Sequence, residues 1–303
     1  MCADKLMQPF IEGLKNAPDR RKDINKVRNW MQNQAHLPQI SDEFIHLFLH
    51  ACFYSVDKTK HCIESYFTIR TNNPFIFGNR DLFSDSIQTM MSLAHMARLP
   101  RLTPEGHRIL VYRLADPDYR KMVFSEGVKA FCMVNDVILS EDGLVDGYII
   151  VFDMKGVQLG HLARVSLPAL RVFMHYIQDA HPARLKAIHV LHTASWINHV
   201  MRLLIPLARS DIMSILKFHQ GSVPDGVPLE LLPEDYGGNE GLIERLHSEQ
   251  YAMMIEKYQK WLLEGETLKV DESKRAKKSS WLSIFTSSSA KDEPGFKNLA
   301  EID

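Results

Sequence analysis

Two things are scarce in this sequence: cysteine and long apolar runs. The longest uninterrupted apolar run, residues 203–208, is far shorter than the roughly 20 residues that cross a bilayer. The first fifteen residues carry charges at Asp4, Lys5 and Glu12 and lack the apolar stretch of a secretory signal. We therefore expect a cytoplasmic protein. The cysteines show no CxxC spacing, which argues against a zinc site or a disulfide framework: Cys2, Cys52, Cys62 and Cys132.

Neither sign of charge dominates. The chain has 36 Lys and Arg against 37 Asp and Glu, so no overall field attracts nucleic acid, and no nucleic-acid partner is expected. Contact with a membrane would need a local patch of basic residues. The closest histidine pair, His189 and His192, lies in a predicted strand, where residues three apart face opposite sides and cannot share an ion. We expect neither a metal nor a cofactor.

The motifs of three common α/β enzyme classes are also missing. The predicted strand at residues 108–114 is followed by ADPDYRK, without the glycines that a dinucleotide site requires, and the chain has neither a phosphate-binding P-loop nor a Gly-x-Ser-x-Gly elbow. Ser166 fits a helix N-cap better than a nucleophile. Asp153 stands alone after an apolar strand, with His161 as its only nearby candidate partner, and we interpret it as a turn residue. We expect no catalytic residue, and a hydrolase-like enzyme remains an alternative.

The chain changes pattern near residue 80. Apolar residues at helical spacing predict three helices, at residues 23–34, 41–53 and 55–70, which form a helical domain over residues 1–80 with a stop at Pro74. Strands at residues 108–114, 148–152, 187–193 and 217–221 then alternate with helices at residues 125–142, 167–182 and 195–216. This order is typical of an α/β fold with a parallel or mixed sheet, over residues 85–240.

The last sixty residues differ again. Residues 241–264 have the pattern of one more helix, and residues 265–303 mix basic residues and serines, which predicts a flexible tail. A short apolar segment around Trp281 interrupts this tail. The tail is therefore interpreted either as a solvated linker or as a segment that attaches to a membrane or a protein partner.

Four stretches together are similar to one known family. GYIIVFDMKGVQLGHL, LKAIHVLHTASWINHVMRLLIPLARSDIMSILKFHQ, LPEDYGG and the helical DEFIHLFLHACFYSVDKTKHCIESYFTIR resemble the CRAL-TRIO family of tocopherol and retinaldehyde transfer proteins, over about residues 20–262. The closing GFKNLAEID is similar to the insect tocopherol-transfer-like branch. The resemblance implies an N-terminal three-helix domain, then a CRAL-TRIO α/β domain with a mostly parallel sheet and a helical gate over an apolar pocket.

The resemblance further implies a binding protein and no enzyme. Such a protein would carry a small hydrophobic ligand, such as a tocopherol, retinoid, carotenoid or related lipid, and exchange it at a membrane surface as a monomer. The gate falls on residues 196–214, whose apolar surplus would cover the ligand when closed and meet lipid when open. The pocket positions of the family fall on Ala130, Val134, Tyr148, Phe152, Val165, Ile177, His181 and Ile188, and we add their neighbours Phe131, Ile138, Ile150, Val190, His192, Ile197, Val200 and Leu204.

Two departures from the family bear on the ligand. Ala130 and Val134 stand where the tocopherol carriers have two pocket serines, which argues against tocopherol itself and leaves three polar groups to orient a ligand: Tyr148, His181 and His192. The family's phosphoinositide-binding cluster falls on Cys52, Arg184, Asp211 and Ile215, where only Arg184 keeps the charge. We therefore predict weak head-group recognition.

A rearranged basic patch remains possible on the sequence alone. It would combine Arg184 with Lys186, Arg202, Arg209 and Lys217. The alternative function is accordingly a lipid-sensing interaction module that binds phosphoinositide membranes or protein partners.

Overall fold

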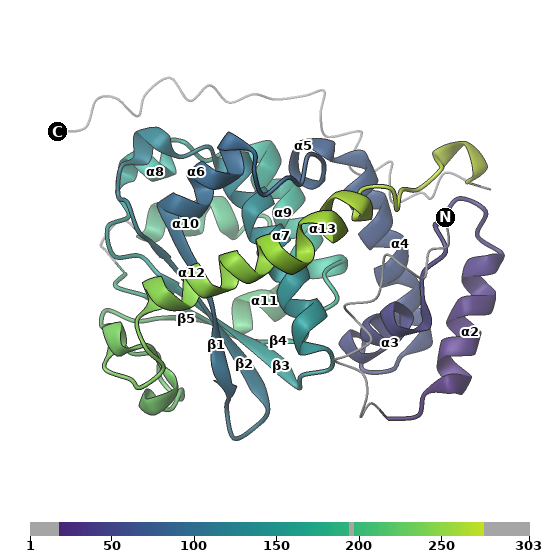
Figure 1. Cartoon of the computed structure of the whole chain (residues 1–303), viewed down its shortest axis with the longest axis horizontal. Coiled ribbons are helices and arrows are strands. Elements are labelled where there is room, and N and C mark those ends of the chain that lie inside the picture. The colour runs from purple at the N-terminus through teal and green to yellow at the C-terminus, as the bar shows by residue number, and fades with distance from the viewer. Residues whose placement is uncertain (1–17, 194–196, 276–303) are drawn as a thin grey trace.

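The computed structural model describes residues 18–193 and 197–275 (Figure 1). Its N-terminal region contains helices α2 (Arg21–Gln32), α3 (Asp42–Ala51) and α4 (Val56–Asn72), so the three predicted helices are confirmed. Ser41 caps α3 by accepting a hydrogen bond from the Phe44 amide. α4 stops before Pro74, which instead begins the short helix α5 (Pro74–Phe77), and α6 (Asp85–Leu93) leads into the sheet.

The sheet has five strands in the order β1 (Ala94–Leu102), β2 (His107–Leu114), β3 (Gly147–Asp153), β4 (Leu185–Leu191) and β5 (Leu216–Phe218). β2 to β5 run parallel, which confirms the mostly parallel sheet, and β1 is antiparallel to β2. The sequence analysis missed β1. Its apolar pattern is interrupted by Arg98 and Pro100, and its register shifts between Arg98 and Leu102, as is common for an edge strand.

Helices from distant parts of the chain surround the sheet. They are α7 (Phe124–Asp142), the short α8 (Leu159–Leu162), α9 (Leu167–Asp179), α10 (Ile197–Leu204), α11 (Ser210–Ser214), α12 (Ile243–Met253) and α13 (Gln259–Gly265), with a π-helical turn at Met254–Tyr258 between the last two. Short 3₁₀ turns lie at Tyr119–Lys121, Leu229–Leu231, Glu234–Tyr236 and Glu272–Lys274. Ser166 caps α9 through the Ala169 amide, as predicted.

α12 protects the edge of β1. The His247 ring nitrogen Nδ1 accepts from the Met96 amide at 3.2 Å, and Gln250 Oε1 accepts from the Arg98 amide at 2.9 Å. These side chains bind backbone groups that would otherwise be free to pair with another strand. Figure 1 shows α12 and α13 as one long rod that crosses the front of the molecule.

The sheet separates two apolar clusters. Tyr148 and Ile150 face the larger cluster, with α7 and the helical region, whereas Ile149 and Val151 face the smaller one, as period-two alternation requires. The smaller cluster is completed by residues from 227–246, such as Leu232. The side of the sheet that carries the predicted pocket residues Tyr148 and Ile150 is therefore the side toward α7 and α9.

The segment after α13 returns to the N-terminal helices. We call residues 266–275 the C-terminal strap. The Asp271 amide donates to the His36 carbonyl, the Val270 amide donates to Thr71 Oγ1, both at 2.9 Å, and the Arg275 side chain pairs with Glu64. The flexible tail predicted from residue 265 is therefore corrected for this stretch, because its polar groups bind the helical region. Trp281 and the rest of residues 276–303 lie outside the described residues.

Candidate ligand-binding cavity

One apolar cavity of about 460 Å³ lies between the sheet and the helices α7, α9, α10 and α11. Its floor is formed by side chains of β2, β3 and β4: Leu110, Tyr148, Ile150, Phe152, Ile188 and Val190. Its walls include residues of α7 and α9, among them Phe131, Ile138, Phe173 and Ile177. The volume falls within the range of about 300–1,000 Å³ that is typical of ligand pockets.

The cavity has no charged lining residue among those that the structure describes, and only three polar ones: Asn135, Tyr148 and His181. Burial lowers the pKa of His181 to about 4 and raises the pKa of the Tyr148 phenol, so both are neutral near pH 7. Asn135 is already committed, because its Oδ1 accepts from the Tyr112 hydroxyl and its Nδ2 donates to the Phe131 carbonyl. This lining would favour an uncharged apolar molecule over a charged one.

Most of the pocket positions chosen from the sequence meet at this cavity. Twelve of the sixteen line it: Phe131, Ile138, Tyr148, Ile150, Phe152, Val165, Ile177, His181, Ile188, Val190, Val200 and Leu204. Whether they contact a ligand remains a prediction.

Two helical positions require correction. Ala130 and Val134 are buried in α7 but do not line the cavity. Successive helix residues point about 100° apart, so the face of α7 that carries Phe131 and Asn135 to the cavity turns Ala130 into the packing behind it. The argument that these two positions replace pocket serines therefore has no support in this geometry.

His192 and Ile197 do not line the cavity either. His192 has a left-handed backbone, φ 50°, and its Nδ1 lies 2.6 Å from Asp153 Oδ1. Asp153 also accepts from the Tyr236 hydroxyl at 2.9 Å and from the Lys155 amide at 2.9 Å. The interpretation of Asp153 as a turn residue is confirmed by the Lys155 bond, and His192 belongs to this cluster because its backbone turns away from the strand. Ile197 packs against the core.

The sequence analysis missed many of the lining residues outside the gate segment. These residues come mainly from α7, α9 and the turns around them: Met122, Phe124, Gly127, Val128, Leu139, Leu162, Leu170, Phe173 and Met174. A signal was present, because Phe124, Val128, Phe131 and Asn135 recur at spacings of three and four along one helix face. Periodicity identifies the buried face but cannot say which part of it borders a cavity.

The predicted gate is two short helices, α10 and α11, which we call the gate segment (residues 197–214). Val200, Leu204 and Ile212 turn to the cavity, yet neither helix contains a fully buried residue. Gln178 at the end of α9 connects to this segment: its Nε2 donates to the Leu207 carbonyl at 3.0 Å, and its Oε1 accepts from the Arg209 amide at 2.6 Å. The first predicted gate residue, Trp196, lies outside the described residues.

The five residues of the predicted basic patch do not share one environment. Arg202 is exposed on α10. Arg209 is paired with Asp179 and Asp211, so its charge is neutralised within the gate region. Arg184 donates to the His50 carbonyl at 2.7 Å and stacks on the Phe53 ring. Lys186 and Lys217 are exposed.

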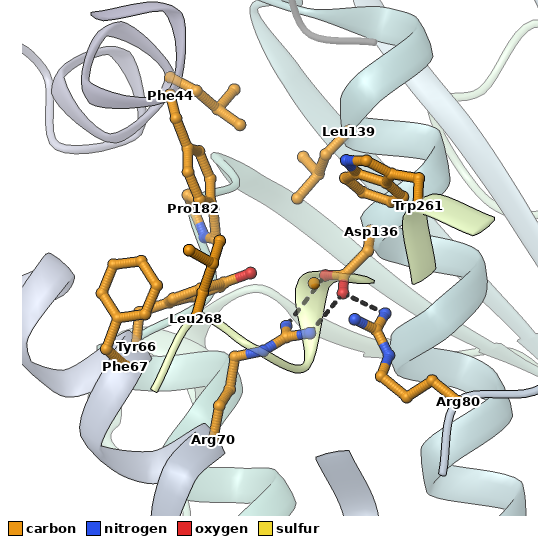
Figure 2. Close-up of a pocket in the computed structure, with 12 residues that line it drawn as sticks. Phe44, Tyr66, Phe67, Arg70, Arg80, Asp136, Leu139, Pro182, Trp261 and Leu268 are labelled. Atoms are coloured by element: carbon orange, nitrogen blue, oxygen red, sulfur yellow. Dashed lines mark hydrogen bonds and ion pairs between the residues drawn. The ribbon is translucent and has the colours of Figure 1, made fainter. Parts of the chain in front are cut away.

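A buried charge cluster lies beside the cavity, and the sequence analysis did not identify it. Figure 2 shows Asp136 of α7 between the guanidinium groups of Arg70 and Arg80, next to a small void of about 40 Å³. Arg70 donates to Asp136 at 2.7 Å and to the Tyr176 hydroxyl at 2.9 Å. Burial alone would raise the pKa of Asp136, but Arg70 and Arg80 hold it below its usual value. The signal in the sequence was a carboxylate within an apolar helix.

Neither metal nor membrane-spanning features occur in the part of the chain that the structure describes. No group of three His, Cys, Asp or Glu side chains there could hold a metal ion. No helix within residues 18–193 or 197–275 is both long and apolar enough to cross a bilayer.

The described residues form an α/β protein with an apolar cavity between its sheet and helices, and comparison with known proteins shows which families it resembles. Residues 95–238 match the family described as CRAL/TRIO domain, and residues 16–87 match that described as Pinta-like, UBA domain. Residues 95–238 are therefore assigned to the CRAL/TRIO domain family.

Curated relatives agree with this assignment. The chain is 24% identical over 253 residues to the human alpha-tocopherol transfer protein-like protein. The aligned region covers 80% of this chain and 72% of that protein. It is 22% identical over 244 residues to rat clavesin-2, covering 78% of this chain and 75% of that protein. Among solved structures, Sfh5 aligns with a TM-score of 0.45 at 13% identity, over 84% of this chain and 96% of that one.

Proposed function

We propose that this protein binds a small hydrophobic ligand, such as a tocopherol, retinoid, carotenoid or related lipid, and transfers it between membranes. The observation that carries the proposal is the cavity of about 460 Å³ without a charged lining residue in the described chain. Membership of a family of lipid-transfer proteins supports it, as does the similarity to a protein named for alpha-tocopherol transfer. The protein acts by binding, and no covalent step is needed.

Burial of the ligand supplies enough free energy for tight binding. Enclosing about 400 Å² of apolar ligand surface at about 25 cal/mol per Å² contributes on the order of 10 kcal/mol before association costs. A ligand that lies between the sheet and the helices would leave more easily if one wall of the cavity moved away. The gate segment is that wall, because its helices contain no fully buried residue and opening it exposes little core.

Gln178 holds the gate segment closed in this proposal. Its side-chain amide binds both the Leu207 carbonyl and the Arg209 amide, which tie the loop between α10 and α11 to α9. Contact with a membrane would compete with these bonds and release the segment. Arg184, Lys186 and Lys217 would supply the basic groups for that contact, whereas Arg209 is occupied by Asp179 and Asp211.

Lipid content tests the binding function. Native mass spectrometry and organic extraction of the purified protein should detect bound lipid at close to one molecule per chain. Ile188→Trp places a large side chain in the cavity floor and should reduce that content strongly, whereas Leu242→Trp, at a side chain that is 50% exposed, should leave it unchanged. Equal lipid content in both variants and the wild type would contradict the proposal.

Transfer rates test the gate. Gln178→Ala should speed the exchange of a fluorescent lipid between donor and acceptor vesicles, because it removes two hydrogen bonds that hold the closed segment. Gln88→Ala is the matched control, since this exposed amide in α6 binds only the Phe83 carbonyl. An unchanged rate for Gln178→Ala would show that the segment is not held this way.

A further inference from the structure

The buried charge cluster around Asp136 carries more positive than negative charge. Arg70 and Arg80 share this single carboxylate, and the side chains of Arg70, Arg80 and Asp136 are 11%, 4% and 6% exposed. The two arginines hold the pKa of Asp136 below its usual value, so the carboxylate is ionised near pH 7 and the cluster has a surplus of one positive charge. A buried charge without a counter-charge is costly, because it has lost its hydration.

The surplus charge borders the void of about 40 Å³ that lies next to the cluster. No other charged side chain of the described residues lines this void. Tyr66 lines it, but burial raises the pKa of its phenol, so this group is neutral near pH 7. Glu266 accepts a hydrogen bond from the Arg80 amide at 2.6 Å, yet within the described chain it forms no ion pair with the Arg80 guanidinium.

Arg80 also has hydrogen-bond donors to spare at this void. Its Nη2 donates to Asp136, and its Nε and Nη1 donate to no other residue that the structure describes. A Cβ atom placed on Gly265 would lie 3.8 Å from Arg80 Nη1, so this nitrogen is next to Gly265, which lines the void. Figure 2 shows the Arg80 guanidinium near Asp136 and Trp261, another lining residue.

We propose that this void binds one small monovalent anion of about the size of chloride, held by the Arg80 guanidinium beside the Asp136 ion pairs. About 10–15 Å³ is enough for one water, so a void of about 40 Å³ has room for chloride, which is only slightly larger than water. Water would accept a hydrogen bond from Arg80 but would leave the surplus charge uncompensated. An anion accepts the hydrogen bond and supplies the counter-charge.

The anion would bind the folded chain and not the unfolded one. Its site combines Arg70 of α4, Arg80 of the segment after α5, Asp136 of α7 and Gly265 of α13, which only folding brings together. A ligand that binds only the native state stabilises it by mass action. The inference is independent of the proposed transfer function, since it concerns the stability of the fold.

Urea unfolding in mixtures of sodium chloride and sodium gluconate tests the proposal. The total salt is kept at about 200 mM, so that screening stays constant, and gluconate is too large for the void. The unfolding equilibrium constant of the full-length wild type should fall about tenfold, and saturably, once chloride reaches about ten times its dissociation constant. Arg80→Met removes the surplus charge and the spare donors and should abolish this response. Arg101→Met is the control, because this arginine pairs with Glu240 and its side chain is 53% exposed, and its response should equal that of the wild type.

Bromide in place of chloride gives a measurement that needs no variant. Crystals of the wild type in bromide should show an anomalous scattering peak in the void, whereas density without an anomalous signal would mean that water alone fills it and would overturn the proposal. Wild-type stability that does not change with chloride would overturn it too. So would an equal chloride response in Arg80→Met and the wild type, or an equal loss of the response in Arg101→Met.

Discussion

Asp136 offers the sharpest test of how the helical region is joined to the α/β part. Its carboxylate forms ion pairs with Arg70 of α4 and with Arg80 of the segment between α5 and α6, and its side chain is 6% exposed. Asp136→Ala would leave two buried guanidinium groups without their shared anion. Removing one partner from a buried ion pair costs about 3–5 kcal/mol. Since domains are stable by about 5–15 kcal/mol, this loss should be plain in a urea titration.

An ion pair on the surface serves as the control for the cost of losing a buried one. Asp57 pairs with Lys60 at 3.3 Å, but its side chain is 94% exposed, so Asp57→Ala should cost no more than about 1 kcal/mol. If Asp136→Ala also costs less than about 1 kcal/mol, the two guanidinium groups find other compensation and the reasoning is wrong. The double variant Asp136→Ala/Arg80→Met should be less destabilised than the sum of its single changes, because fewer uncompensated charges remain.

Acid titration gives an independent measurement on the same residue. Because the two arginines hold the pKa of Asp136 below its usual value, the ionised carboxylate contributes stability that is complete above the unfolded-state pKa, near 3.8. That contribution is lost as the pH falls through the lower folded-state pKa. Asp136→Asn should therefore be less stable than the wild type at neutral pH and should lose less stability on acidification. Parallel titrations of the two proteins would contradict the linkage.

Three further predictions concern other parts of the chain. Burial lowers the pKa of His181 from 6.5 to about 4, so the ligand-free wild type should lose up to about 3 kcal/mol of unfolding free energy as the pH falls from 6.5 to 4. In urea titrations at several pH values, His181→Phe should lose less stability over this pH range. An equal loss in the variant and the wild type would disprove this prediction. Asp153→Asn should cost about 1–3 kcal/mol by disturbing bonds to His192 and Tyr236, and unaltered stability would exclude that role. Arg275→Ala should loosen the C-terminal strap, seen as faster amide exchange in α4; protection equal to wild type would show that the strap is not held by this residue.

Much of the fold follows from local sequence, because helices and strands are specified by spacing over a few residues. Ser41 and Ser166 cap the helices they precede, and Pro74 stops α4, as each residue's own chemistry requires. Tyr148, Ile149 and Ile150 alternate between the two faces of β3, as the two-residue period of a strand requires. The family was also visible in the sequence, since its motifs are long and keep their order.

The tertiary structure decided what depends on contacts between distant residues. β1 pairs with β2 on one side, and on its other side His247 and Gln250 of α12 bind its backbone, although they lie 151 and 152 residues away in the sequence. No local pattern predicts that contact. The sequence analysis placed Ala130 of α7 in the cavity lining, but Ala130 does not line it. Helical periodicity identifies a buried face but does not show which part of the protein that face contacts.

The polar and charged sites show the same division. The sequence determined that Tyr148 and His181 are polar residues in apolar surroundings, but only the folded chain brings both of them to the lining of the cavity. Asp136 and His192 find their partners across 56 and 39 residues of sequence. Local sequence specifies helices, turns and strand faces because their interactions span a few residues. Partners and cavities are decided by packing, which brings together residues that no short pattern relates.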